Sequence, residues 1–320
     1  MIQHLRRPVA AVAAFLALLL PLTACTADTS EPGTLTVGFV VDPSWAQIPV
    51  AQQGGYFDKH GLKVKVVNFS TGVEALQALA AHQVDVTTAA DVPTSAALTR
   101  SPGLRVVGDG SRWQGSRVVA RRSAGIGRVE DLAGRTIGTP LGTSAAYFAS
   151  NTLSHSAVTA KLVQVAPSAT VTAATQRNVD AIAIFQPYQA QVIAALGDDA
   201  IALGGDAYNQ HSLYLASDTA VAGKKSELSS FFAALNEAGG QLTARSDAAV
   251  AAVAAATQLP ADLVGKILGE FDFTLQLRPD LAQTLAAQGD WAKGQGSIDG
   301  SVRLPDYGTF LDADFLTPAS

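Results

Sequence analysis

From Thr34 onwards, two hydrophobic patterns alternate along the chain. Short apolar runs typical of buried strands are followed by segments whose apolar residues recur every three or four positions, as on one face of a helix. The predicted strands cover residues 35–40, 62–67, 84–88, 104–107, 118–120, 136–138, 162–165, 181–185 and 213–216. Between them, predicted helices cover residues 49–54, 72–81, 126–133, 143–153, 169–176 and 187–196.

The last third of the chain has a different pattern. Only helical periodicity is found there, in residues 228–242, 248–256, 261–268 and 280–293. Short strands that alternate with helices are typical of parallel, doubly wound sheets. The pattern therefore predicts an α/β protein with two lobes and a helical C-terminal segment.

The N-terminus has the pattern of a signal sequence. Arg6 and Arg7 precede an apolar run that is too short for a comfortable membrane span. The run ends at Leu22-Thr23-Ala24-Cys25, which resembles the lipobox of bacterial lipoproteins. We expect residues 1–24 to be a signal peptide, Cys25 to carry the lipid and residues 25–33 to form a tether. The alternative is an ordinary signal peptide with an incidental cysteine.

Composition narrows the class of protein. Hydrophobic residues make up 48% of the 320 residues and charged residues 15%, so the chain can bury a sizeable core. A net charge of −5 argues against a nucleic-acid partner. Cys25 is the single cysteine, which excludes a disulfide within the chain and a cysteine-based zinc cluster.

Sequence motifs give little support for catalysis. The chain has no Gly-x-Ser-x-Gly motif, no Walker loop and no His-Glu-x-x-His pair, and its five histidines are scattered. Carboxylates brought together from distant loops remain open as an alternative. We expect a protein that is not an enzyme and that needs no cofactor or metal.

Six segments resemble, in order, the nitrate, sulfonate and taurine type of ABC transporter substrate-binding proteins, which includes relatives that bind pyrimidine precursors of thiamine. They include a helix that ends in a glycine-aromatic sequence, a glycine-hydroxyl helix start and a variant of an aromatic-acid-proline-tyrosine motif. The segments are residues 48–57 (IPVAQQGGYF), 60–64 (HGLKV), 72–86 (GVEALQALAAHQVDV), 129–138 (VEDLAGRTIG), 142–144 (GTS) and 185–188 (FQPY).

The resemblance implies a periplasmic-binding-protein-like fold that closes on a solute between its lobes. Residues 34–115 would start lobe 1, residues 116–212 would form lobe 2, and residues 213–320 would return to lobe 1. The expected partners are a small solute, such as a sulfonate, nitrate or related anion, and an ABC permease with its ATPase. The protein would be a monomer outside the cytoplasm, held on the outer face of the cell membrane by lipid on Cys25. The alternatives are an extracytoplasmic enzyme or a pyrimidine-precursor-binding protein on the same fold, and a binding protein that only signals to a sensor partner.

Three residues at helix starts and loops are candidates for ligand contact. Thr143 and Ser144 begin a helix after a glycine turn, where free backbone N–H groups can hold an anion or be capped by the hydroxyls themselves. Trp45 lies on the loop after the first strand, at the end of the sheet where ligands bind in such folds. Its ring can stack on a ligand or pack on the lobe surface.

Five further candidates lie near the crossovers and helix starts. Asp91 can accept from a ligand or cap the helix that carries Pro93. Trp113 and Arg117 lie at the first crossover, where Arg117 can bind an anion or form a surface or hinge ion pair. Gln186 stands where the family usually has an acid and cannot balance an ammonium, and Tyr188 can belong to the cleft or to the core.

Overall fold

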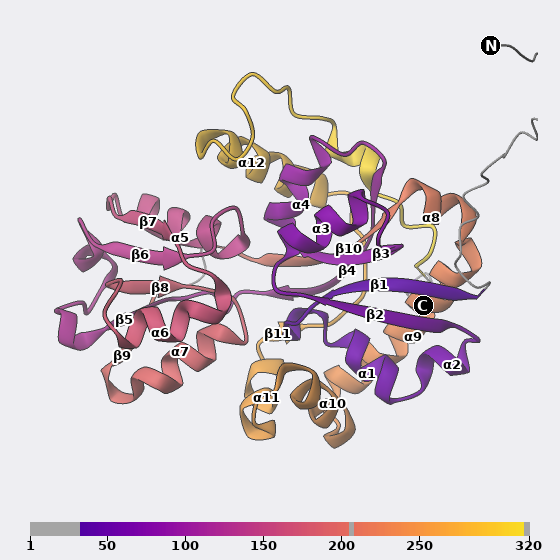
Figure 1. Ribbon diagram of the computed structural model, residues 1–320, viewed down its shortest axis with the longest axis horizontal. Coiled ribbons are helices and arrows are strands. Elements are labelled where there is room, and N and C mark those ends of the chain that lie inside the picture. The colour runs from indigo at the N-terminus through magenta and orange to yellow at the C-terminus, as the bar shows by residue number, and fades with distance from the viewer. Residues whose placement is uncertain (1–32, 205–207, 317–320) are drawn as a thin grey trace, which may run out of the picture. The chain divides into compact units, whose positions relative to one another are not determined.

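The computed structural model describes residues 33–204 and 208–316 (Figure 1). The predicted signal peptide, the predicted lipid site at Cys25 and residues 25–32 of the predicted tether lie outside the described residues.

The first strand starts a mixed sheet of six strands, which defines lobe 1. Its order is β11-β4-β10-β3-β1-β2, with β1 parallel to β2 and β3 and with β10 antiparallel to β3 and β4. The strands are β1 (Thr34–Val40), β2 (Lys63–Phe69), β3 (Val86–Ala90), β4 (Leu104–Trp113), β10 (Gln210–Ser217) and β11 (Phe271–Asp272).

A second sheet of five strands defines lobe 2, on the left of Figure 1. Its order is β7-β6-β8-β5-β9, with β6, β7 and β8 parallel and with β5 antiparallel to β8 and β9. The strands are β5 (Val118–Arg121), β6 (Thr136–Thr139), β7 (Lys161–Gln164), β8 (Ala181–Ala183) and β9 (Ala200–Leu203).

Helices cover the sheets of both lobes. Those of lobe 2 are α5 (Ser144–His155), α6 (Thr170–Thr175) and α7 (Tyr188–Leu196). Those of lobe 1 are α1 (Gln47–Gln53), α2 (Tyr56–Lys59), α3 (Gly72–Ala80), α4 (Asp91–Leu98), α8 (Asp218–Gly223), α9 (Lys225–Thr243), α10 (Asp247–Thr257), α11 (Ala261–Leu268) and α12 (Leu281–Gly294). The prediction of an α/β fold with a helical C-terminal segment is confirmed.

Local sequence explains several of the element boundaries. Thr71 caps α3 by accepting a hydrogen bond from the backbone N–H of Glu74 at 3.2 Å, and Ser246 caps α10 in the same way. The sheets are mixed rather than wholly parallel, because β5 and β10 each follow a crossover and enter their sheets in the reverse direction. The predicted connecting helix at residues 126–133 is a short 3-10 helix, Val129–Leu132.

Lobe 1 has an apolar core on each face of its sheet. On one face, α1, α9, α10 and α11 bury an aromatic cluster in which Tyr214, Phe231 and Phe232 make edge-to-face contacts. On the other face, α3, α4 and α12 pack against Leu213 and Leu215 of β10. Strand β10 therefore contacts both apolar layers of lobe 1.

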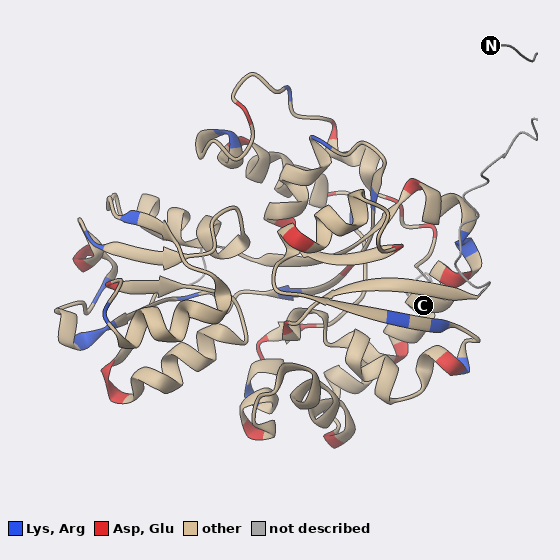
Figure 2. Ribbon diagram, viewed as in Figure 1, with Lys and Arg blue, Asp and Glu red and all other residues tan. Residues whose placement is uncertain are grey.

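Two segments connect the sheets. The first runs from the end of β4 at Trp113 to the start of β5 at Val118, and the second leads from β9 into β10. The limits predicted for the lobes, at residues 115/116 and 212/213, stay predictions. Acidic and basic residues are spread over both lobes (Figure 2). Among the described helices, none alone has the length and apolarity of a membrane span, although the bent pair α10 and α11, which turns by 108°, meets those criteria together.

Candidate functional site

A small pocket lies where loops of lobe 1 meet α5 and the β8–α7 loop of lobe 2. We call it the cleft pocket. Its volume is about 20 Å³, close to the space that one water molecule needs. The lining residues come from strand ends and helix starts of both lobes: Val40, Asp42, Trp45, Gly72, Ala90, Pro93, Thr143, Ser144, Phe185 and Gln210. This is the end of the strands where ligands bind in doubly wound folds.

The start of α5 presents uncapped N–H groups to the cleft pocket. Thr143 is the residue before the helix, but its side chain makes no capping hydrogen bond. The Thr143 hydroxyl instead donates to the carbonyl of Pro140 at 2.6 Å. Ser144 is buried, and its side chain hydrogen-bonds Tyr208. The first-turn N–H groups and the positive end of the helix dipole are therefore available to a polar ligand.

Asp42 supplies the one charged side chain of the cleft pocket within the described chain. It follows β1, is 3% exposed and accepts a hydrogen bond from the backbone N–H of Ser44 at 2.7 Å. Burial raises the pKa of Asp42 to about 7, although hydrogen bonds from Ser44 oppose that shift. A further hydrogen bond holds the turn of Asp42 and Ser44 against β4, since the Ser111 hydroxyl donates to the Ser44 carbonyl at 2.6 Å.

Trp45 and Gln210 complete the lobe 1 side of the pocket. The Trp45 indole N–H donates to the carbonyl of Leu213 at 3.2 Å, so the ring is held against β10 and is only 3% exposed. Gln210 begins β10 and is 2% exposed. Its Nε2 atom donates to the Ser44 hydroxyl at 3.4 Å, whereas its Oε1 atom is buried without a hydrogen-bond partner among the described residues.

Lobe 2 adds aromatic side chains from the β8–α7 loop. Phe185 lines the pocket, and Tyr188 packs edge-on against it with the ring centroids 6.2 Å apart. Burial, followed by the nearby charge of Asp42, raises the pKa of Tyr188. Gln186 is buried beside the pocket, where its Oε1 atom accepts from the backbone N–H of Ala190 at 3.2 Å. That amide is used to hold the start of α7.

Two predicted site residues lie away from the cleft pocket lining. Trp113 is buried in the core, donates from its indole N–H to Glu270 at 2.9 Å and stacks on Phe271. Arg117 lies in the first connection between the lobes, and its guanidinium donates to the carbonyls of Gln114 and Ser116. Their predicted contact with a ligand stays a prediction.

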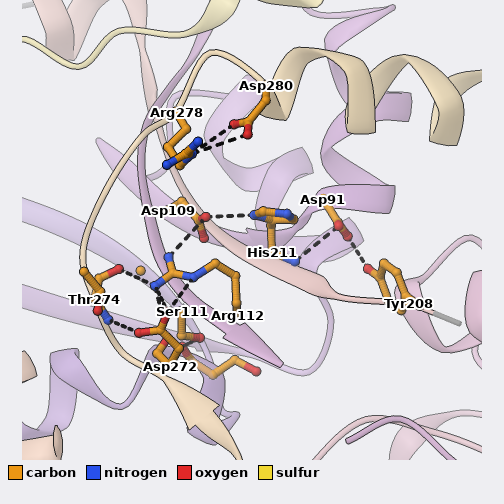
Figure 3. Close-up of polar contacts among 12 residues, drawn as sticks. Asp91, Asp109, Ser111, Arg112, Tyr208, His211, Asp272, Thr274, Arg278 and Asp280 are labelled. Atoms are coloured by element: carbon orange, nitrogen blue, oxygen red, sulfur yellow. Dashed lines mark hydrogen bonds and ion pairs between the residues drawn. The ribbon is translucent and has the colours of Figure 1, made fainter. Parts of the chain in front are cut away.

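Asp91 belongs to a buried polar chain next to the pocket (Figure 3). It is the first residue of α4 and accepts hydrogen bonds from the Tyr208 hydroxyl and from the backbone N–H of His211. Burial raises the pKa of Asp91, and the nearby His211 opposes that shift. Because Tyr208 also hydrogen-bonds Ser144, the chain joins the start of α5 in lobe 2 to α4 and β10 in lobe 1.

The polar chain continues into an open groove of about 680 Å³, which we call the charged groove. Asp109 accepts from Arg112 at 3.3 Å and contacts His211 at 2.8 Å, while its other oxygen is buried without a partner in the described structure. Burial lowers the pKa of His211, but the hydrogen bond and charge of Asp109, with the charge of Asp91, outweigh this and raise it. The charged lining residues are Asp109, Arg112, His211, Glu270, Asp272, Arg278 and Asp280.

The described residues contain no group of three or more His, Cys, Asp and Glu side chains that could hold a metal ion. Asp42, Phe185 and Gln210 are pocket residues that the sequence did not indicate as ligand contacts. The signal for Asp42 was its place directly after a predicted strand, in the same loop as Trp45. Gln210 carried no such signal, because its strand was predicted to begin only at residue 213.

Comparison with known proteins adds the family. A family model described as NMT1/THI5 like matches residues 42–249. The chain belongs to this family. A protein of Brucella abortus (strain 2308), provisionally named as a binding protein, is 30% identical over 178 residues. That match covers 54% of this chain, and this NMT1/THI5-like protein spans about half the length of the curated relatives it matches.

Solved structures share the fold of this NMT1/THI5-like protein. The periplasmic aliphatic sulphonate binding protein SsuA from Escherichia coli has a TM-score of 0.77 at 20% identity, with 91% of this chain and 95% of that chain covered. The periplasmic nitrate-binding protein NrtA from Synechocystis PCC 6803 has a TM-score of 0.71 at 10% identity, covering 89% and 87%. The predicted resemblance to sulfonate and nitrate binding proteins is confirmed for fold and family.

An enzyme shares the fold too. A mutant of DSZB in complex with biphenyl-2-sulfinic acid has a TM-score of 0.67 at 18% identity, with 88% of this chain and 97% of that chain covered. Another structure of DSZB is described as that of a desulfurization enzyme. The fold therefore occurs in both binding proteins and enzymes, and the function has to be argued from the site.

Proposed function

We infer that this protein is the extracytoplasmic solute-binding component of an ABC importer, which captures a small solute between its lobes and delivers it to a permease. The observation that carries this proposal is the cleft pocket, which unites Trp45 and Asp42 of lobe 1 with the uncapped start of α5 in lobe 2. Family membership and the shared binding-protein fold support it.

The mechanism is closure of the lobes around the solute. A solute that touches both walls of the cleft pocket interacts better with the closed arrangement than with an open one, and this difference shifts the equilibrium. Contacts between lobes already favour closure, because Tyr147 of α5 packs edge-on against Trp291 of α12, and Tyr208 of the connection between the lobes packs against the same Tyr147 ring. These contacts and the polar chain through Asp91 have to separate when the cleft opens.

The solute's acceptor end belongs at the start of α5 in this proposal. Sulfonates, nitrate and related oxyanions present several acceptor oxygens, which suit the first-turn N–H groups around Ser144. Trp45 would cover the less polar part of the solute. The proposal also includes lipid on Cys25, so a Cys25→Ser protein should leave the membrane fraction or remain unprocessed, and acyl mass on the native N-terminus would support it.

The test is a thermal-shift screen of purified protein over sulfonates, nitrate, carboxylates, pyrimidines and aromatics, followed by calorimetric titration of the compounds that stabilise it. A solute at about 100 times its Kd should add roughly 2.7 kcal/mol of stability. Ser144→Ala removes a hydroxyl from the α5 start and should weaken binding about ten- to a hundredfold, since one hydrogen bond to a charged group contributes about 1.5–3 kcal/mol. Ser154→Ala, an exposed position near the other end of α5, is the control.

Unchanged affinity in Ser144→Ala would exclude the Ser144 hydroxyl as a contact of the solute. Mass spectrometry of the bound solute after prolonged incubation separates transport from catalysis. Recovery of the unchanged compound supports a binding protein, whereas conversion of the compound would place the protein with the enzymes of this fold.

A further inference from the structure

The lobe 1 wall of the cleft pocket includes two buried side chains that offer hydrogen-bond acceptors. Asp42 contributes a carboxyl group that is 3% exposed, and Gln210 contributes an amide oxygen that is buried without a partner among the described residues. Both residues line the same pocket of about 20 Å³. The Gln210 oxygen has lost water without gaining a donor, which costs free energy, so a ligand that donates to it would recover that cost.

Neighbouring groups keep these acceptors in place without neutralising them. Ser44 links the two residues, since its backbone N–H donates to Asp42 at 2.7 Å and its hydroxyl accepts from Gln210 Nε2 at 3.4 Å. None of the pocket-lining residues in the described chain is Lys or Arg. Tyr188, the other titratable group that the charge of Asp42 reaches, cannot supply a positive charge.

The opposite wall has the reverse polarity. Thr143 leaves the first turn of α5 uncapped, so that wall offers N–H donors and the positive end of a helix dipole. The cleft pocket therefore has an acceptor side on lobe 1 and a donor side on lobe 2. A simple anion such as nitrate would complement only the lobe 2 side, would leave the Gln210 oxygen without a donor and would bring a negative charge close to the Asp42 carboxyl group.

We propose that Asp42 and Gln210 form a donor-selecting subsite, which restricts the solute to dipolar compounds that carry an N–H or ammonium group at one end and acceptor oxygens or ring nitrogens at the other. The inference rests on the proposed function, because it assigns a chemical class to the solute of that same cleft. Asp42 then acts as the specificity-determining residue, and Gln210 adds a second, neutral acceptor.

The experiment compares three pairs of probes that differ by one amino group: 2-aminoethanesulfonate with ethanesulfonate, 3-aminopropionate with propionate, and 4-aminopyrimidine with pyrimidine. Calorimetric titration at pH 8 should show preference for the amino member of at least one pair by about ten- to a hundredfold, the range of one charge-assisted hydrogen bond. Asp42→Asn, which keeps an oxygen for the Ser44 N–H, should remove most of that preference. Gln210→Leu should reduce it by a smaller factor.

Two controls keep the outcomes separate. Asp58→Asn changes an exposed acid on α2 and should leave the preference unchanged. Melting curves of each variant identify any that has not folded, and Asp42→Ser replaces Asp42→Asn in that case. Binding of an amino-free member as tightly as its partner overturns the donor subsite, and if Ser144→Ala weakens that binding the proposed function stands. Failure of all six probes and of the wider screen to bind overturns the proposed function and the subsite with it.

Discussion

The cleft pocket and the charged groove differ in size and in charge. The groove has a volume of about 680 Å³ and seven charged or titratable residues, whereas the cleft pocket has about 20 Å³ and one acid. Yet the groove's charges are largely matched within the protein: Arg112 contacts Asp109 and Asp272, and Arg278 contacts Asp280 (Figure 3). The comparison teaches that a large, charged groove can be mostly structural, whereas a small pocket lined by residues of both lobes is the better candidate for a solute site.

Disruption of the groove should give the largest effect, and it should be an effect on stability. Arg112→Met leaves Asp109 buried without the guanidinium and should lower the free energy of unfolding by about 3–5 kcal/mol. Solute affinity should stay the same, because the charged residues of the groove stabilise lobe 1 and do not line the cleft pocket. Urea denaturation and calorimetric titration measure the two quantities. The control is Arg278→Met, which breaks an exposed pair and should cost less than about 1 kcal/mol.

The opposite result would exchange the roles of the two regions. If Arg112→Met folded with normal stability and lost solute binding, the charged groove would be the better candidate for the functional site.

The buried Asp42 should make the free energy of unfolding depend on pH. Its folded pKa is about 7 against an ordinary value of 3.8, so between these values the native protein keeps a proton that the unfolded chain has released. The contribution of Asp42 to stability therefore falls as pH rises from about 4 to about 7 and is constant above that range. Asp42→Asn lacks this loss, and at pH 8 it should gain up to about 4 kcal/mol relative to wild type, compared with pH 4.

Urea denaturation of both proteins at intervals between pH 4 and pH 8 measures that difference. The Asp58→Asn protein should follow the wild-type curve. Parallel curves for wild type and Asp42→Asn would mean that Asp42 has an ordinary pKa, and the contrast between a desolvated cleft acid and the paired acids of the groove would be lost.

The smallest effect should come from the contact between lobes at α5. Tyr147 packs edge-on against Tyr208 and Trp291, with ring centroids 5.1 and 5.2 Å apart, and each such pair contributes about 0.5–1.5 kcal/mol. Tyr147→Leu should therefore favour an open arrangement, with a larger radius of gyration by small-angle X-ray scattering and a modest loss of affinity. Tyr56→Leu on α2 is the control. An unchanged radius would show that these rings do not hold the lobes together.

The sequence predicted the regular elements well where apolar periodicity was continuous, as in β1, α3 and α9. It failed for the end of β4, where residues 108–113 (GDGSRW) have the composition of a loop. Those residues are in a strand because β10 and β11 pair with them, which is a long-range contact without a local signal. Strand β9 was missed for the same reason, since it is short and pairs only with β5 at the sheet edge.

Residues of the candidate site could be predicted where their position between a strand and a helix indicates a role. Trp45, Thr143 and Ser144 were found from their places after a strand and before a helix, and all three line the cleft pocket. Asp42 and Gln210 were missed, because the value of an acceptor depends on its burial and on the partners it lacks. Those properties arise from tertiary packing, which has no local signal in the sequence.

The nearly filled cleft pocket has a kinetic consequence. With room for about one water molecule, the lobes have to part before any solute can enter. If the empty protein spends most of its time in this arrangement, the observed association rate cannot increase without limit as solute is added. It should approach a plateau equal to the rate of lobe opening, and stopped-flow measurements of tryptophan fluorescence at increasing solute concentration would give that rate.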